Sequence, residues 1–247
     1  MSGKLTSLLA SQDMTQGSPS GNLIRFSVPL LIGNLAQQLY STVDSIVVGY
    51  YVGDNALAAV GASGPIMNLL LVLFMGISVG ASVMVSQYFG AKDRERLEKT
   101  VGTTLTATVV SSIFIMVVGP LITPPVMSAL STPPEIYDMA CTYLVILFAG
   151  IVGSAFYNIL SGVLRGLGDS VTPVVFLIIA CLLNIVLDVW FVAGFHWDVA
   201  GVAIATIISQ IVSGGLCLIR MFFMRDVLSV KPAYLWPKAQ YLKQLIR

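Results

Sequence analysis

Residues 170–195, SVTPVVFLIIACLLNIVLDVWFVAGF, form an apolar run that is long enough to cross a bilayer as a helix. One aspartate, Asp188, lies inside this run, and an Asp at the centre of a membrane helix opposes insertion by about 2.5–3.5 kcal/mol. Asn184 precedes it by four residues, so both side chains occupy one face of the helix. Because ionisable groups in membrane helices mark ion or proton sites, Asp188 is a candidate functional residue.

The composition of the whole chain is that of an integral membrane protein. Its 247 residues are 56% hydrophobic and only 10% charged, whereas a soluble domain carries about 25% charged residues. The net charge of +1 indicates no nucleic-acid partner. Apolar windows predict an all-α membrane fold with six spans, at 24–51, 56–88, 100–122, 136–163, 170–195 and 199–223.

The basic residues give the expected orientation. The connections at 53–55, 123–138 and 194–201 contain no Lys or Arg, so all 13 basic residues fall on the other side of the membrane. The positive-inside rule then places both termini in the cytoplasm, in a multi-pass protein of the plasma or inner membrane. We expect residues 1–22 to be a flexible cytoplasmic tail, 23–223 a six-helix lobe, and 224–247 a cytoplasmic segment.

Two glycine pairs have the spacing that allows membrane helices to approach closely. Gly76 and Gly80 form one pair, and Gly162 and Gly166 form the other. Both pairs predict close helix packing, and neither bears on function.

The first predicted span carries a polar face. At 100° per residue, one arc of about 120° contains six polar residues: Asn34, Gln37, Gln38, Ser41, Asp44 and Ser45. Such a face must line a helix contact or an aqueous cavity. The sixth span repeats the pattern with Thr206, Ser209, Gln210 and Ser213.

Depth along the helices predicts that these polar residues meet. At 1.5 Å per residue, Asp44 lies about 30 Å and Asp188 about 27 Å from the cytoplasmic starts of their spans. Thr206 lies about 10 Å below the outer start of the sixth span, so all three fall in the outer half of the bilayer. We therefore expect one shared site.

The sequence offers no internal counter-charge for this site. The only basic residues within the predicted spans, Arg25 and Arg220, lie at the cytoplasmic ends of the first and sixth spans. A buried Asp188 therefore either takes up a proton or binds a metal cation such as Na⁺, with Asn184 and Asp44 as further ligands. For Asn184 and Thr206, ordinary hydrogen bonding between helices is the alternative.

The chain resembles the multidrug and toxic compound extrusion (MATE) family of secondary transporters over residues 22–247. The resemblance is carried by five stretches in order: FSVPLLIGNLAQQLYSTVDSIVVG (26–49), SQYFGAKDRERLEKTVG (86–102), LRGLGDSVTP (164–173), NIVLDVW (184–190) and GVAIATIISQ (201–210). It implies two six-helix lobes, of which this chain corresponds to the N-terminal one and residues 224–247 to the linker. The second lobe would belong to the same full-length chain or to a dimer partner.

The resemblance also implies a function and a set of residues. The implied function is export of amphipathic, often cationic, organic compounds by alternating access, driven by H⁺ or Na⁺, with no other cofactor. The implied coupling residues are Asp44, Asn184, Asp188, Thr206, Tyr143 and Asn158. The expected cavity lining is Asn34, Gln37, Gln38, Ser41 and Gln210, and Pro29 is the expected hinge.

Two other functions fit the sequence less well. Tyr137–Asp138 and GLGD (166–169) look like the paired aspartates of an intramembrane protease, but the predicted topology puts Asp138 and Asp169 on opposite faces, about 45 Å apart. GLGDS instead indicates a turn with Asp169 or Ser170 capping the fifth span. We expect no enzyme and, without a phosphate-binding loop, no direct ATP drive. A flippase-like or non-transporting helical subunit remains the alternative.

Overall fold

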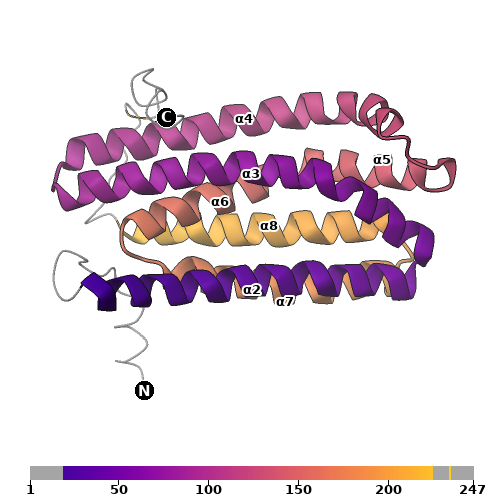
Figure 1. Cartoon of the computed structure of the whole chain (residues 1–247), viewed down its shortest axis with the longest axis horizontal. Coiled ribbons are helices and arrows are strands. Elements are labelled where there is room, and N and C mark those ends of the chain that lie inside the picture. Colours follow the sequence, from indigo (N-terminus) through magenta and orange to yellow (C-terminus); the bar gives the residue numbers. More distant parts are fainter. Residues whose placement is uncertain (1–18, 225–233, 235–247) are drawn as a thin grey trace.

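The computed structural model describes residues 19–224 and residue 234, and this part of the chain confirms the predicted all-α fold (Figure 1). The helices are α2 (Pro19–Tyr51), α3 (Asp54–Gly90), α4 (Arg94–Ala129), α5 (Pro134–Ala149), α6 (Ile151–Gly166), α7 (Val171–Val189), the π-helical turn η1 (Trp190–Gly194) and α8 (Asp198–Phe223). The predicted tail ends earlier than expected because α2 begins at Pro19, a residue that the first helical turn tolerates. Apart from Met224 and Tyr234, the predicted linker lies outside the described residues.

The described helices include four apolar spans of the six predicted, or five if the bent pair α5 and α6 counts as one span. Four are long and apolar enough to cross a membrane: α3, α4, α7 with η1, and α8. The fifth is formed by α5 and α6 together, which are bent by 53° at Gly150. With 33 residues, α2 is long enough, but its polar face interrupts the apolar sequence, and it is not among these spans. The chain is therefore a multi-pass membrane protein.

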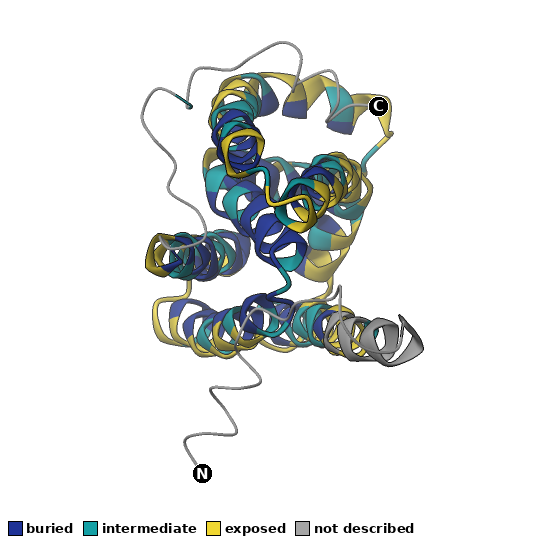
Figure 2. Ribbon diagram, turned by 90° about the vertical axis from the view of Figure 1, so that its left-hand side faces the viewer, coloured by how far each residue is buried: buried dark blue, intermediate teal, exposed yellow. Residues whose placement is uncertain are grey.

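The helices lie side by side along the long axis of the molecule (Figure 1). α2 packs mainly against α7 at one side of the bundle, and α4 packs against α3, α5 and α6 at the opposite side. α6 lies in the interior, against α3, α4 and α8. Buried residues face the centre and exposed residues face outwards (Figure 2). Many of the exposed residues are large and apolar, among them Leu35, Leu69 and Leu121, as a surface in contact with lipid requires.

Glycines allow α6 to pack closely against α3. A Cβ atom on Gly162 would lie 2.3 Å from Ser78 Oγ and 2.6 Å from the Ser78 carbonyl oxygen. A Cβ on Gly166 would lie 2.7 Å from the Ser82 carbonyl oxygen. The pair Gly162 and Gly166 thus forms the predicted close contact, whereas a Cβ on Gly76 would meet nothing within 4 Å.

The other side of α6 is equally close to α8. A Cβ on Gly153 would lie 2.7 Å from the Ile211 backbone nitrogen, and one on Gly214 would lie 3.1 Å from the Gly153 carbonyl oxygen. A Cβ on Gly150 would overlap the Ile207 side chain at 2.2 Å. α6 is therefore held between two helices at distances that leave no room for added atoms.

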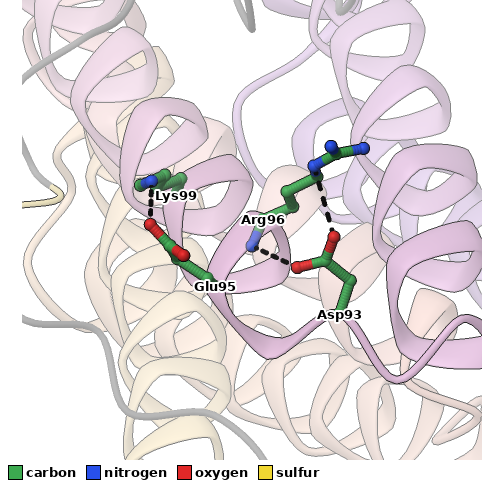
Figure 3. A network of polar contacts seen from close by, with 4 residues as sticks. All are labelled: Asp93, Glu95, Arg96 and Lys99. Carbon is green, nitrogen blue, oxygen red and sulfur yellow. Dashed lines mark hydrogen bonds and ion pairs between the residues drawn. The ribbon is translucent and has the colours of Figure 1, made fainter.

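The α3–α4 connection is stabilised by charged side chains at the start of α4. Asp93 accepts a hydrogen bond from the Arg96 backbone N–H at 3.1 Å and pairs with the Arg96 guanidinium at 3.2 Å (Figure 3). One turn further on, Lys99 pairs with Glu95 (Figure 3). Asp93 thus caps α4, and most of the charged run at 92–99 belongs to this helix.

Asp169 joins the start of α7 to the end of α8. Its carboxylate accepts hydrogen bonds from the Thr172 backbone N–H at 3.1 Å and the Thr172 hydroxyl at 2.8 Å. It also pairs with the Arg220 guanidinium at 3.1 Å. Of the two predicted caps, Asp169 is the one that caps α7, because the Ser170 side chain makes no capping hydrogen bond.

The prolines at 124 and 125 lie within α4, although the sequence suggests a loop over 123–138. The connection to α5 is only residues 130–133. Hydroxyl groups satisfy backbone carbonyls in this segment, since Thr123 donates to the Gly119 carbonyl at 2.8 Å and Tyr137 to the Pro124 carbonyl at 3.0 Å.

Replacing Gly162 with alanine should lower the stability of the bundle. The new Cβ would overlap Ser78, and overpacking of this kind costs about 1–3 kcal/mol. Thermal unfolding in detergent micelles measures the change. Gly76→Ala is the matched control and should not lower the midpoint, because the added Cβ meets nothing within 4 Å. Equal losses from both substitutions would contradict the close contact between α3 and α6.

Candidate functional site

Asp44 and Asp188, the two carboxylates that lie away from the ends of the predicted spans, meet between α2 and α7. Asp44 of α2 and Asp188 of α7 are close enough for their side chains to interact directly. Both are buried, with Asp44 7% and Asp188 0% exposed. The Asn184 side-chain amide donates a hydrogen bond to Asp188 Oδ1 at 3.4 Å. The predicted pair on one face of α7 is thus aligned with the aspartate of α2.

Three further side chains surround the carboxylates. Tyr143 of α5 is near enough to interact electrostatically with both Asp44 and Asp188. Tyr40 of α2 lies beside Asp44 and beside Thr206 of α8. We call these six residues, Tyr40, Asp44, Tyr143, Asn184, Asp188 and Thr206, the acidic cluster. Sequence reasoning missed Tyr40, although its position four residues before Asp44 places it on the same helix face.

The acidic cluster holds buried oxygen atoms that have no hydrogen-bond partner among the described residues. They are Tyr40 Oη, Asp44 Oδ1, Asn184 Oδ1, Asp188 Oδ2 and Thr206 Oγ1. In the next turn of α8, Ser209 Oγ and Gln210 Oε1 are also buried and have no hydrogen-bond partner among the described residues. An unsatisfied buried polar group costs about 1–3 kcal/mol, and the acidic cluster gathers five such oxygen atoms in one place.

The chemistry of the acidic cluster suits a proton or a hard cation. Within residues 19–224, neither Asp44 nor Asp188 forms an ion pair with a Lys or Arg. Carboxylate, amide and hydroxyl oxygens are the donors that hard cations prefer. Alternatively, a proton bound by one carboxylate removes the repulsion between the two. The residues present therefore fit either predicted coupling ion.

Asn158 lies apart from the acidic cluster. It lines a second cavity, of about 50 Å³, with Asn34 and Gln37. Its amide donates to the Ser154 carbonyl at 2.8 Å. The separation arises because Asn158 follows Tyr143 by 15 residues, which corresponds to about 22 Å of helix. The structure thus brings together five of the six predicted coupling residues.

The other residues predicted to line the cavity differ in how far they are buried. Gln38 and Ser41 are exposed on α2, and the Ser41 hydroxyl donates to the Gln37 carbonyl at 3.3 Å. Gln210 is half-buried in α8. Pro29 falls within the bounds of α2, but its side chain lies outside the described residues, so its role as a hinge stays a prediction.

A bundle of membrane helices around a buried acidic cluster is the architecture of a membrane transporter. The family model MatE matches residues 29–190, and the chain belongs to this family. The resemblance to MATE transporters that the sequence shows is thereby confirmed.

Individual relatives give the extent of the similarity. "Probable multidrug resistance protein YoeA" of Bacillus subtilis is 33% identical over 221 residues, which are 88% of this chain and 47% of the relative. A MOP superfamily transporter from Pyrococcus furiosus superposes with a TM-score of 0.86 at 28% identity, over 93% of this chain and 51% of that one. An outward-facing multidrug resistance MATE family transporter superposes with a TM-score of 0.86 at 28% sequence identity, over 97% of this chain and 52% of that one. The chain spans about half the length of the curated relatives it matches.

Asp188→Asn should stabilise the protein in alkaline buffer that contains choline instead of sodium. The substitution removes the repulsion between two buried carboxylates and supplies an amide donor, and relief of an unsatisfied buried group is worth about 1–3 kcal/mol. Thermal unfolding measures the effect. Asp138→Asn, at an exposed position of α5, is the control and should leave the midpoint unchanged. A lower midpoint for Asp188→Asn would contradict an uncompensated carboxylate pair.

Proposed function

We propose that this chain is the ion-binding lobe of an antiporter in the plasma or inner membrane, which exports amphipathic, often cationic, organic compounds in exchange for H⁺ or Na⁺. The observation that carries the proposal is the meeting of Asp44 and Asp188, buried and without an ion-pair partner among the described residues. Membership of a family whose matched relatives are named multidrug resistance proteins supports the choice of cargo.

The cation would couple transport to movement of α2 against α7. When the acidic cluster holds no cation, the two carboxylates repel each other across the helix contact. A proton on one of them, or Na⁺ between them, turns the repulsion into attraction and draws the helices together. For Na⁺, Asn184 Oδ1 and Thr206 Oγ1 would add neutral ligands, whereas a proton requires only the carboxylates. Ion binding therefore favours one arrangement of the bundle over another.

Alternating access places two further requirements on the protein. One is a bend in α2, for which Pro29 is the candidate because a proline removes one backbone hydrogen bond from a helix. The other is a second six-helix lobe that completes the path for the cargo between the lobes. This lobe would come from the same polypeptide or from a second copy of the chain. Both requirements belong to the proposal.

The proposal is tested with membrane vesicles from cells that express the gene in its natural full length. The efflux of a fluorescent organic cation from these vesicles is measured. Sodium and proton gradients are imposed separately, and one of them should accelerate efflux. Asp188→Asn and Asp44→Asn should reduce efflux to the level of vesicles without the protein, because each substitution removes an ionisable ligand. Asp138→Asn should retain the activity of the unaltered protein. Equal amounts of each variant in the membrane are verified by immunoblotting.

Two outcomes would contradict the proposal. Efflux that ignores both gradients would rule out cation coupling. Efflux by Asp188→Asn at the rate of the unaltered protein would leave the acidic cluster with a structural role only, as expected of a non-transporting helical subunit.

A further inference from the structure

The cavity that contains Asn158 is separate from the acidic cluster and has the opposite electrostatic character. It lies between α2, α6 and α7, near the end of the bundle that carries the α6–α7 connection. Its walls include the side chains of Asn34, Gln37, Tyr157, Ser170 and Arg165, and no carboxylate. The lining thus combines one permanent positive charge with neutral hydrogen-bonding groups.

Arg165 is half-buried in the last turn of α6, and its guanidinium forms its hydrogen bonds to described residues with neutral oxygen atoms. Its Nε donates to the Ser161 carbonyl at 3.1 Å, and its Nη2 lies 3.3 Å from Ser161 Oγ and 3.5 Å from Ser78 Oγ. The Ser78 and Ser161 hydroxyls in turn donate to the Asn158 carbonyl, at 2.6 and 2.8 Å. This network fixes the position of the guanidinium, and the described residues in it carry no negative charge.

The other half-buried basic residues of the described part, unlike Arg165, each form an ion pair with an acidic side chain. Arg220 pairs with Asp169, and Lys99 pairs with Glu95. The chain has 12 acidic residues, of which Asp13 and Asp226 lie outside the described part, and none of the other ten forms an ion pair with Arg165. A guanidinium keeps its charge in proteins, and a half-buried charge without a partner is unfavourable. The N–H groups on Nη1 form no hydrogen bond to a described residue and can therefore donate to an anion.

The cavity is large enough for a small anionic group. Its volume of about 50 Å³ exceeds the roughly 10–15 Å³ that one water requires, so a carboxylate or a phosphate group can enter it. Arginine binds both groups through paired N–H donors. Amide groups of Asn34 and Gln37 lie in the same lining as additional donors.

We propose that the cavity lined by Arg165, Asn34 and Gln37 binds the anionic group, a carboxylate or a phosphate, of an amphipathic ligand. The apolar part of the ligand extends from the cavity along the exposed apolar surface of the bundle. The cavity and the acidic cluster lie at different depths, since Asn34 precedes Asp44 by ten residues, about 15 Å along α2. The site is independent of the proposed transport activity, because binding alone defines it.

Binding is measured by isothermal titration calorimetry on the whole chain in dodecyl maltoside micelles, which carry no anionic group. Hexyl phosphate and hexanoate are the anionic probes, and hexanol and hexyltrimethylammonium are the controls. Protein-free micelles give the background heat. A charged hydrogen-bonded contact predicts that the anions bind at least about tenfold more tightly than hexanol. Anions that bind no more tightly than hexanol overturn the proposal, and this comparison requires no variant.

Variants then assign the binding to Arg165. Arg165→Gln should weaken hexyl phosphate binding by about tenfold or more, and Arg165→Lys by less, because it keeps the charge but loses the paired donors. Arg96→Gln removes an exposed positive charge near the same end of the bundle and should change nothing. Unchanged binding by Arg165→Gln, or an equal loss from Arg96→Gln, overturns the proposal.

The source of the anionic group is identified by competition. Displacement of hexyl phosphate by inorganic phosphate indicates that a free anion occupies the site. Displacement by phosphatidylglycerol added to the micelles indicates a lipid head group. If neither competes, the occupant is a soluble amphipathic compound. Each of these outcomes supports an anion site at Arg165, whose existence the preceding measurements decide.

Discussion

The fold depends on the close approach of α6 to its two neighbours. Glycines on α6 let Ser78 and Ser82 of α3 lie against its backbone on one side, and Ile211 of α8 on the other. A bilayer supplies little hydrophobic force to drive helices together, so close packing and interhelical hydrogen bonds hold such a bundle. The Ser78 hydroxyl fulfils both conditions, since it occupies the space beside Gly162 and donates to the Asn158 carbonyl. The remaining helices are arranged around this central element.

The sequence was sufficient to predict the residues whose position follows from one straight helix. Asn184 and Asp188 share a face because they are four residues apart, and depth counted along the helix placed Asp44 near them. The resemblance groups Asn158 with these residues, but 15 residues, about 22 Å of helix, separate it from Tyr143, so the residue count favours the separation that the structure shows. Gly76 and Gly162 show a further limit, since identical spacing does not reveal which glycine has a neighbour. Pro124 and Pro125 lie within α4, where the sequence suggests a loop, and the Tyr137 hydroxyl of α5 that bonds to the Pro124 carbonyl comes from another helix, so no local pattern shows this contact.

Two polar regions of opposite sign occupy one lobe. The acidic cluster offers carboxylate, amide and hydroxyl oxygens, whereas the cavity at Arg165 offers N–H donors and a fixed positive charge. The two regions share α2 and α7, so each is formed by the same pair of helices at a different depth. A charge bound in either region therefore acts on the contact between α2 and α7, which is the contact that the proposed coupling requires.

The break at Gly150 has a mechanical consequence for these two regions. Tyr143 belongs to α5, on one side of the break, and Arg165 belongs to α6, on the other side. A straight helix would transmit a rotation at Tyr143 directly to Arg165, as a rigid rod does. A span bent by 53° converts the same rotation into a sideways displacement of its other half. Ile207 of α8 fills the space beside Gly150, so the joint rests against a neighbouring helix and not against lipid. Motion in one half of this span consequently reaches the other half through α8 as well as through the chain itself.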